Sequence, residues 1–309
     1  MFLFKNISVP LFCTIILLLC YLSGKLWGAD RFWDSDGNTS GLGNSNGSWS
    51  SGGVWSSTTG GTDAKSWVNG STAIFSDGSP TITADLANVT IDGITVTGSN
   101  ANITIANGSG SLELSSGGSG NFNIATGSNL SINETLDYQS TGMLDKTGKG
   151  VLTFGVNNTG SGPNFTTLTQ GKIDLGSSVT DIVGGIFGSG NDKSMVGGDG
   201  QINSLTFGNG DNEIDFVSPG MGLSSSMSSN TSKQQTSAAS DARSNGAEAV
   251  GLLTITNHLT LNGGTIYDWE IADFSPGTAD GSKYDVLKYD SISFEDEQKI
   301  GINILAISN

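Results

Sequence analysis

Short runs of alternating apolar and small polar residues dominate the chain from Ala73 onward. Each run is bounded by Gly, Asn, Ser or Asp, and turn-forming residues recur about every 8–12 positions. A period of two is typical of a strand that buries one face. The clearest runs are 88–92, 93–97, 102–105, 111–114, 121–124 and 129–132. The sequence therefore predicts an all-β chain of many short strands.

These strands favour a right-handed parallel β-helix, a pectin-lyase-like solenoid. Their inward positions are mainly Ile, Val and Leu, and their outward positions are mostly Thr, Ser and Asn. Stacked rungs would bury the apolar side of each strand against its neighbours, and Gly and Asn tolerate the left-handed backbone of tight corners. The hairpin signal Asn107-Gly108 keeps an antiparallel β-sandwich as the alternative.

The segment 30–70 has a different character, because Trp33, Trp49, Trp55 and Trp67 fall among Ser, Gly and Asn. Exposed tryptophans would form a platform for stacking sugars. Buried ones would close the end of the solenoid, whose terminal strand edge needs cover. We favour the cap.

The alternation stops at 223–249, a low-complexity segment rich in Ser that is typical of a flexible loop. The predicted domains are therefore a cap at 30–70, rungs at 71–222, this loop, and C-terminal rungs at 250–309. His258 lies between Asn257 and Leu259, and we interpret it as a turn residue.

The first 29 residues resemble a secretory signal peptide. Lys5 precedes an apolar stretch of about a dozen residues, which is short for a membrane span, and small residues such as Gly28 and Ala29 follow. A permanent membrane anchor is the alternative. Cleavage would remove both cysteines, so the mature chain would have no disulfide and no membrane span.

The amino-acid composition argues against two classes of function. The chain has 46 glycines in 309 residues, about twice the usual share, and a single histidine. A metal site built from several histidines is thus excluded. With 29 acidic and 13 basic residues, the net charge of −16 argues against binding nucleic acid, which needs clustered Lys and Arg.

The segment at about 143–176 resembles the passenger-associated transport repeat, also called the autotransporter-associated β-strand repeat. Its core reads Met-Leu-Asp-Lys-Thr-Gly-Lys-Gly-Val-Leu-Thr-Phe-Gly from Met143 to Gly155, followed by Thr166-Thr167-Leu168 and by Gln-Gly-Lys-Ile-Asp-Leu at 170–175. The glycines Gly148 and Gly150 would turn the chain into a strand. Blocks at 67–76, 218–220 and 261–270 are similar to flanking parts of the larger secreted proteins that carry this repeat.

The resemblance implies a bacterial autotransporter passenger-type protein. Such a protein is exported to the extracellular space or the cell surface of a Gram-negative-type bacterium, at the outer membrane. The broken spacing between Ser218-Pro219-Gly220 and the Gly251-Leu252 step implies that the low-complexity segment is inserted at one corner of the solenoid.

An enzyme acting on polysaccharides would need paired carboxylates. The candidates are Asp34 with Asp36, Asp181, Asp192, Asp199, the series Asp211, Glu213 and Asp215, and Asp268 with Glu270. None of them forms a recognisable catalytic motif, and Lys and Arg are sparse. No catalytic residue is therefore predicted, and a polysaccharide lyase or hydrolase is the alternative.

Calcium is a weak candidate ligand. Asp34, Asp36 and Asn38 place oxygen atoms at alternate positions, as at the start of an EF-hand loop, but the glycine comes one position early and Ser45 replaces the expected glutamate. Asp211, Glu213 and Asp215 would form an acidic stripe on one strand face. Ordinary Asx turns explain both patterns, and we predict no bound metal and no cofactor.

The leading expectation is a non-enzymatic exported surface protein with adhesin-type binding to a surface glycan or a protein. A regular polar solenoid face suits such binding. A structural component of the envelope or matrix is the third possibility.

Overall fold

The computed structural model describes residues 28–37, 39–85, 89–115, 119–139, 143–160, 165–182, 184–188, 194–207, 215–219, 251–271, 285–294 and 300–306. These residues form β-strands and turns, with no helix among them. The predicted leader therefore lies almost wholly outside the described residues. No described helix is long and apolar enough to cross a membrane.

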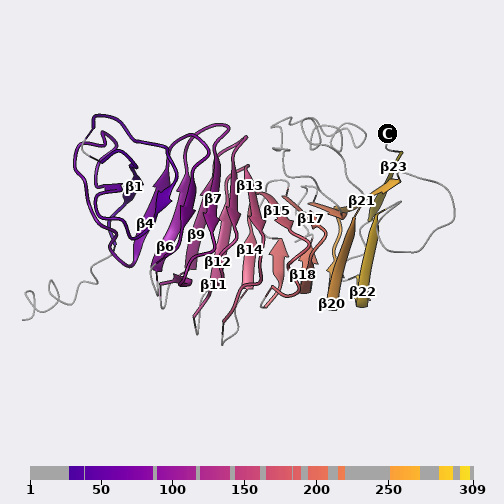
Figure 1. Cartoon of the computed structure of the whole chain (residues 1–309). Coiled ribbons are helices and arrows are strands. Elements are labelled where there is room, and N and C mark those ends of the chain that lie inside the picture. Colours follow the sequence, from indigo (N-terminus) through magenta and orange to yellow (C-terminus); the bar gives the residue numbers. More distant parts are fainter. Residues whose placement is uncertain are drawn as a thin grey trace, which may run out of the picture.

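The strands form two long sheets in which neighbours are parallel, as predicted for a β-helix (Figure 1). The ten-stranded sheet, sheet B, is parallel throughout. It comprises β2 (Gly47–Ser48), β5 (Thr81–Thr83), β7 (Asn102–Ala106), β10 (Asn129–Ile132), β13 (Val151–Phe154), β15 (Gly171–Leu175), β17 (Ser194–Gly198), β19 (Asp215–Pro219), β21 (Thr265–Ile271) and β23 (Gly301–Ala306).

The thirteen-stranded sheet, sheet A, alternates with sheet B along the chain. It comprises β1 (Arg31–Trp33), β3 (Trp55–Ser56), β4 (Ser71–Phe75), β6 (Val89–Val96), β8 (Leu112–Leu114), β9 (Ser119–Ile124), β11 (Leu136–Asp137), β12 (Met143–Thr147), β14 (Phe165–Leu168), β16 (Ile186–Gly188), β18 (Gln201–Phe207), β20 (Leu252–Leu261) and β22 (Val286–Ser293). Among the described strands of this sheet, only the pair β1–β3 is antiparallel. The antiparallel sandwich is therefore wrong, and Asn107-Gly108 joins strands of different sheets.

One turn of the solenoid takes a little over twenty residues. Leu130 pairs with Leu152, and Leu152 pairs with Ile173, so like side chains stack in register. A short third side runs through the first half of β6, then β8 and β11, to Thr159. The long strand β6 joins the predicted runs 88–92 and 93–97, because its two halves pair with β8 and β9 respectively.

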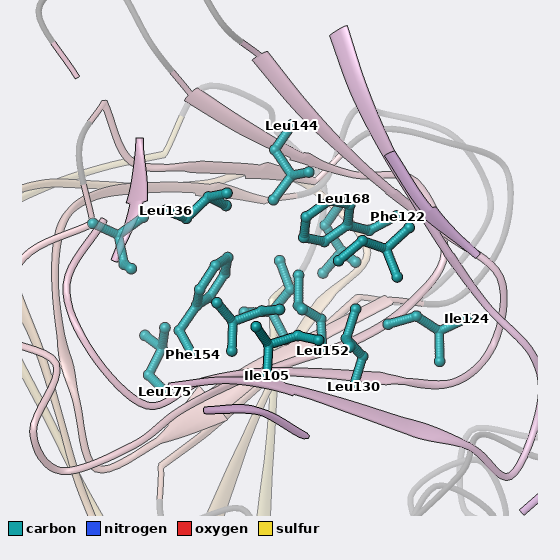
Figure 2. Packing of buried hydrophobic residues seen from close by; sticks show 14 of the residues in the cluster. Ile105, Phe122, Ile124, Leu130, Leu136, Leu144, Leu152, Phe154, Leu168 and Leu175 are labelled. Carbon is teal, nitrogen blue, oxygen red and sulfur yellow. The ribbon is translucent and has the colours of Figure 1, made fainter. Parts of the chain in front are cut away.

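The core fills the space between the two sheets. Figure 2 shows Ile105, Leu130 and Leu152 of sheet B facing Phe122 and Leu144 of sheet A across the interior. Each of these side chains is fully buried. Because every rung offers apolar side chains to the rungs on both sides, the stack buries one continuous core without a disulfide.

The segment resembling the transport repeat forms two successive rungs, β12–β13 and β14–β15. Met143 pairs with Phe165, and Leu152 with Ile173. Gly148 has a φ of 72° at the corner between β12 and β13, a left-handed value that favours glycine. The expected turn at these glycines is thus present.

The rungs continue in register on both sides of the low-complexity segment. β18 pairs with β20, with Gln201 opposite Thr254, although the intervening chain is more than twice the length of an ordinary turn. The described flanks thus agree with an insertion at one corner. The predicted loop 223–249 itself lies outside the described residues.

Candidate binding face on sheet A

The outer face of sheet A carries a ladder of residues in register, most of which have polar side chains. Phe122 and Leu144 point inward, so their neighbours Asn121 and Asp145 point outward. Most members of the ladder are exposed or half-exposed. From the capped end, it runs through Thr72, Gly93, Asn121, Asp145, Thr167, Phe187, Thr206, Thr260 and Ser293.

Hydrogen bonds between rungs hold these side chains in place. Thr147 Oγ1 donates to Asn121 Oδ1 at 3.1 Å, and Thr169 Oγ1 donates to Asp145 Oδ1 at 2.7 Å. Each bond links one rung to the next on the outer surface. The face is therefore a preorganised array of hydroxyl, amide and carboxylate groups, which repeats at the strand spacing of about 4.8 Å.

An aromatic pair interrupts the ladder at its middle. The rings of Phe165 and Phe187 lie 5.3 Å apart at 74°, an edge-to-face contact between adjacent rungs. Both rings are half-exposed, and the exposed Met143 pairs with Phe165 in the preceding rung. Solvent-exposed apolar surface therefore lies beside the Asp145 and Thr167 side chains.

His258 also belongs to this face, so its assignment to a turn is wrong. It lies within β20, where the pairing register with β22 shifts. Its ring nitrogens Nδ1 and Nε2 hydrogen bond to the hydroxyls of Ser291 (2.7 Å) and Ser293 (2.8 Å) in the next rung. A catalytic histidine would have a carboxylate on one nitrogen to orient it. In His258 both ring nitrogens contact serine hydroxyls instead, so this residue extends the polar ladder on sheet A.

The outer face of sheet B contrasts with this open surface. The register Val151, Lys172, Met195, Phe216 and Ile266 crosses five strands, and each side chain is at most 5% exposed. A ligand arriving from solvent therefore finds the open array on sheet A and a closed surface across these strands of sheet B.

One charged cluster on sheet B has unusual electrostatics. Asp174 is buried beside Lys172, and Thr153 hydrogen bonds to its carboxyl group. Burial, and to a smaller extent the charge of Asp199, raise the pKa of Asp174 to about 7, while Lys172 opposes the shift. A polysaccharide-active enzyme would need such groups facing solvent on neighbouring rungs. Lys172 and Asp174 are covered instead.

Lys146 is buried inside the solenoid, which the sequence did not reveal. It points inward between Phe122 and Leu168. Its Nζ donates to the carbonyl oxygens of Thr147 (2.9 Å), Gly148 (2.7 Å) and Gln170 (3.0 Å). Burial lowers the pKa of Lys146, while the charge of Asp145 opposes this shift. The lysine of the repeat-like motif therefore clamps two adjacent corners.

The remaining predicted acidic residues are scattered. Asp181 and Asp199 are exposed at corners, where Asp181 N donates to Asn157 Oδ1 and Asp199 Oδ1 accepts from Leu252 N. Asp192, Asp211 and Glu213 lie outside the described residues, and so do the side chains of Asp268 and Glu270 on β21. The structure does not bring the described members together as a pair.

The calcium candidates are partly described. Asp34 is fully buried, its Oδ1 accepts from Gly43 N (3.0 Å), and its Oδ2 has no hydrogen-bond donor. Burial raises the pKa of Asp34, and contact with the carboxyl group of Asp36 raises it further. Asn38 lies outside the described residues.

The second calcium candidate rests on Asp215, which is buried on β19. Its Oδ1 accepts from the backbone N–H and the hydroxyl of Ser194. Among the described residues, no group of three or more His, Cys, Asp or Glu side chains is placed to hold a metal. Calcium binding stays untested.

The tryptophans of the N-terminal segment pack against one another. Trp33, Trp49 and Trp55 are at most 1% exposed, and the Trp33 and Trp55 rings meet edge to face at 5.1 Å. Trp67 is partly buried and packs against Trp49 and Trp55. The three buried rings cannot stack on sugars, so the prediction of a sugar-stacking platform is wrong for them. Together with Phe75 they form the start of the core.

No protein-family model, curated protein or solved structure matches this chain.

Proposed function

We propose that the protein is a non-enzymatic, exported surface protein whose outer sheet A face binds a glycan in the manner of an adhesin. One observation carries this proposal: an open, mostly polar row of residues in register surrounds a half-exposed Phe165–Phe187 pair. Export and a place at the cell surface are part of the proposal and rest on the predicted leader and the repeat resemblance.

The chemistry of the face matches that of a carbohydrate chain. The C–H faces of sugar rings pack on aromatic rings, and sugar hydroxyls hydrogen bond to hydroxyl, amide and carboxylate groups. Asp145, Thr167 and Asn121 supply these three groups around the aromatic pair. A ladder that continues from rung to rung offers polar contacts to successive units of a linear polysaccharide. This favours an extended glycan over a compact ligand.

Binding to polysaccharides tests the proposal. The probes are soluble pectin in affinity gels and insoluble cellulose and chitin in sedimentation assays. Binding to at least one probe is expected. The double variant Phe165→Ala/Phe187→Ala should weaken it about tenfold, because two aromatic contacts are together worth about 1.4 kcal/mol. Val68→Ala, which trims an exposed apolar residue of the cap, is the matched control. No binding to any probe, or equal binding by the double variant, contradicts the proposal.

The second candidate function is a polysaccharide-active enzyme. The raised pKa of Asp174 beside Asp199 is a property of catalytic acids, but the side chain of Asp174 is only 4% exposed. Release of reducing ends or unsaturated products from pectin would support it, provided that Asp174→Asn abolishes the activity. Loss of activity in Asp215→Asn would support a site on β19 instead. A purely structural envelope component would show neither glycan binding nor activity.

A further inference from the structure

The side of the solenoid next to the sheet A ladder carries a row of carboxylates. Strand β6 belongs to both sides, because its first half pairs with β8 and its second half begins with Gly93 of the ladder. Glu113 of β8 pairs with Asp137 of β11, and the sequence neighbours of both are buried and apolar, so these two side chains point outward. Asp92, which directly precedes Gly93, is half-exposed. Three acidic residues therefore follow the border of the ladder.

A fourth carboxylate lies within the ladder, beside the aromatic pair. Asp145 pairs with Thr167, which lies two positions after Phe165 on the same face of β14. Its Oδ1 accepts a hydrogen bond from Thr169 Oγ1 (2.7 Å), so the carboxylate is held in this place on the surface. A ligand that packs on the rings of Phe165 and Phe187 therefore meets this negative charge.

The described basic residues do not offset these charges. Lys288 is the one on a sheet A strand that points away from the core, and β22 lies five strands beyond β12. At the usual strand spacing this separation is roughly 24 Å, more than the screening length of about 10 Å in 0.1 M salt. The others are Arg31 and Lys65 in the cap, Lys146 inside the core, Lys149 at the corner after β12, and Lys172 buried on sheet B.

We propose that the ligand of the sheet A face is an uncharged glycan, and that the face discriminates against chains of uronic acids or sulfated sugars. This inference rests on the proposed glycan binding and names its substrate class. Sugar hydroxyls can donate hydrogen bonds to the carboxylate of Asp145, whereas a uronate or sulfate there would place like charges in contact. The net charge of −16 also repels a polyanion at longer range.

Pairs of polysaccharides that share one backbone test this charge dependence. Cellulose and chitin are each compared with their lightly carboxymethylated forms in sedimentation assays, and highly methyl-esterified pectin is compared with its de-esterified form in affinity gels. For every backbone that binds, we expect the neutral form to bind at least about tenfold more tightly than the anionic form. Higher salt should narrow this difference, because it screens the repulsion.

Substitution of Asp145 locates the discrimination on the ladder. Asp145→Lys should tighten binding to the anionic form at least about tenfold, because it replaces a repulsive contact by an attractive one. Asp145→Asn, whose amide oxygen can still accept from Thr169, should narrow the difference between the two forms. Asp30→Lys makes the same change of net charge at an exposed residue of the cap and should keep the wild-type preference. Circular dichroism confirms that each variant keeps its strands.

The outcomes separate this inference from the proposed function. An anionic form that binds as tightly as its neutral counterpart overturns the inference and leaves glycan binding in place. A preference for the neutral form that Asp145→Lys does not change also overturns it, because the discrimination then comes from elsewhere on the molecule. If no form of any probe binds, the proposed function fails, and this inference fails with it.

Discussion

At the scale of single residues, hydrogen bonds from buried polar side chains hold the backbone at the corners of this solenoid. Lys146 donates hydrogen bonds to three backbone carbonyl oxygens at two adjacent corners. The alternation of apolar and polar residues does not predict this role, because it normally assigns a lysine to the outward face of a strand. The repeat-like motif carried the signal: its lysine directly precedes the Thr-Gly step, where the chain turns.

Lys146→Met should therefore destabilise the protein strongly. The variant keeps the apolar stem but removes three hydrogen bonds from a charged donor, so we expect a loss of about 3 kcal/mol in the free energy of unfolding. Urea unfolding followed by circular dichroism measures it. Lys149→Met, the same change at a half-exposed position three residues later, should cost less than about 0.5 kcal/mol. Equal losses of unfolding free energy in the two variants would show that the hydrogen bonds of Lys146 do not stabilise the corners.

Asp174 should make stability depend on pH. Its carboxyl ionises near pH 3.8 in the unfolded chain, but near pH 7 in the fold. Between these values the unfolded state binds fewer protons, so stability falls as pH rises, by at most about 1.4 kcal/mol per pH unit. Asp174→Asn should flatten this part of the profile, measured by urea unfolding from pH 4 to 7. The exposed Asp181→Asn should keep the wild-type slope.

The carboxyl groups of Asp34 and Asp36 are in contact, and either a shared proton or a bound cation could offset their charges. We expect a proton, so that Asp34→Asn, whose amide can donate to Asp36, raises the free energy of unfolding by about 1 kcal/mol at neutral pH. Differential scanning calorimetry should show no change in Tm between calcium and chelator. A calcium-dependent rise in Tm that Asp34→Asn abolishes would instead establish a cation site.

At the scale of elements, strand positions follow the sequence pattern closely, and strand lengths depend on the partners. The predicted runs 102–105 and 129–132 lie in β7 and β10. The alternation around His258 breaks, yet β20 continues through it because β18 and β22 pair along both halves. Which strands become neighbours depends on the length of each rung, and a local pattern does not contain this information.

The corners between strands should be the elements least tolerant of substitution. Gly171 has a φ of 85°, and a Cβ there would lie 2.4 Å from the carbonyl oxygen of Gly148. Gly171→Ala should therefore lower the free energy of unfolding by at least about 2 kcal/mol. Gly52→Ala, where the added carbon meets no atom within 4 Å, should change it by less than about 0.5 kcal/mol. Chemical unfolding of both variants compares them directly, and equal losses would contradict this view of the corners.

At the scale of the whole molecule, the fold was predictable and the binding face was not. The period-two runs and the turn residues indicated a parallel β-helix, and the paired strands confirm it. The aromatic pair was missed, because Phe165 and Phe187 become neighbours only through the register of β14 and β16. Their separation by about one rung length was the available signal. Burial of the N-terminal tryptophans agrees with the cap.

Removal of the cap should change how the molecules assemble. Deletion of residues 30–69 would expose the edges of β4 and β5 that β1 and β2 cover. These edges could then pair with another chain, and we expect large, concentration-dependent assemblies in light scattering. Cap variants that remain small and soluble would show that the tryptophan segment does not protect this end.

The pairing of Gln201 with Thr254 has a consequence for protein engineering. The chain between β19 and β20 is much longer than an ordinary corner, and β20 still pairs with β18 as the next rung. The entropic cost of a longer loop grows only logarithmically with its length. This corner is therefore a natural graft point, where a foreign peptide or a small domain could be displayed beside an unaltered scaffold.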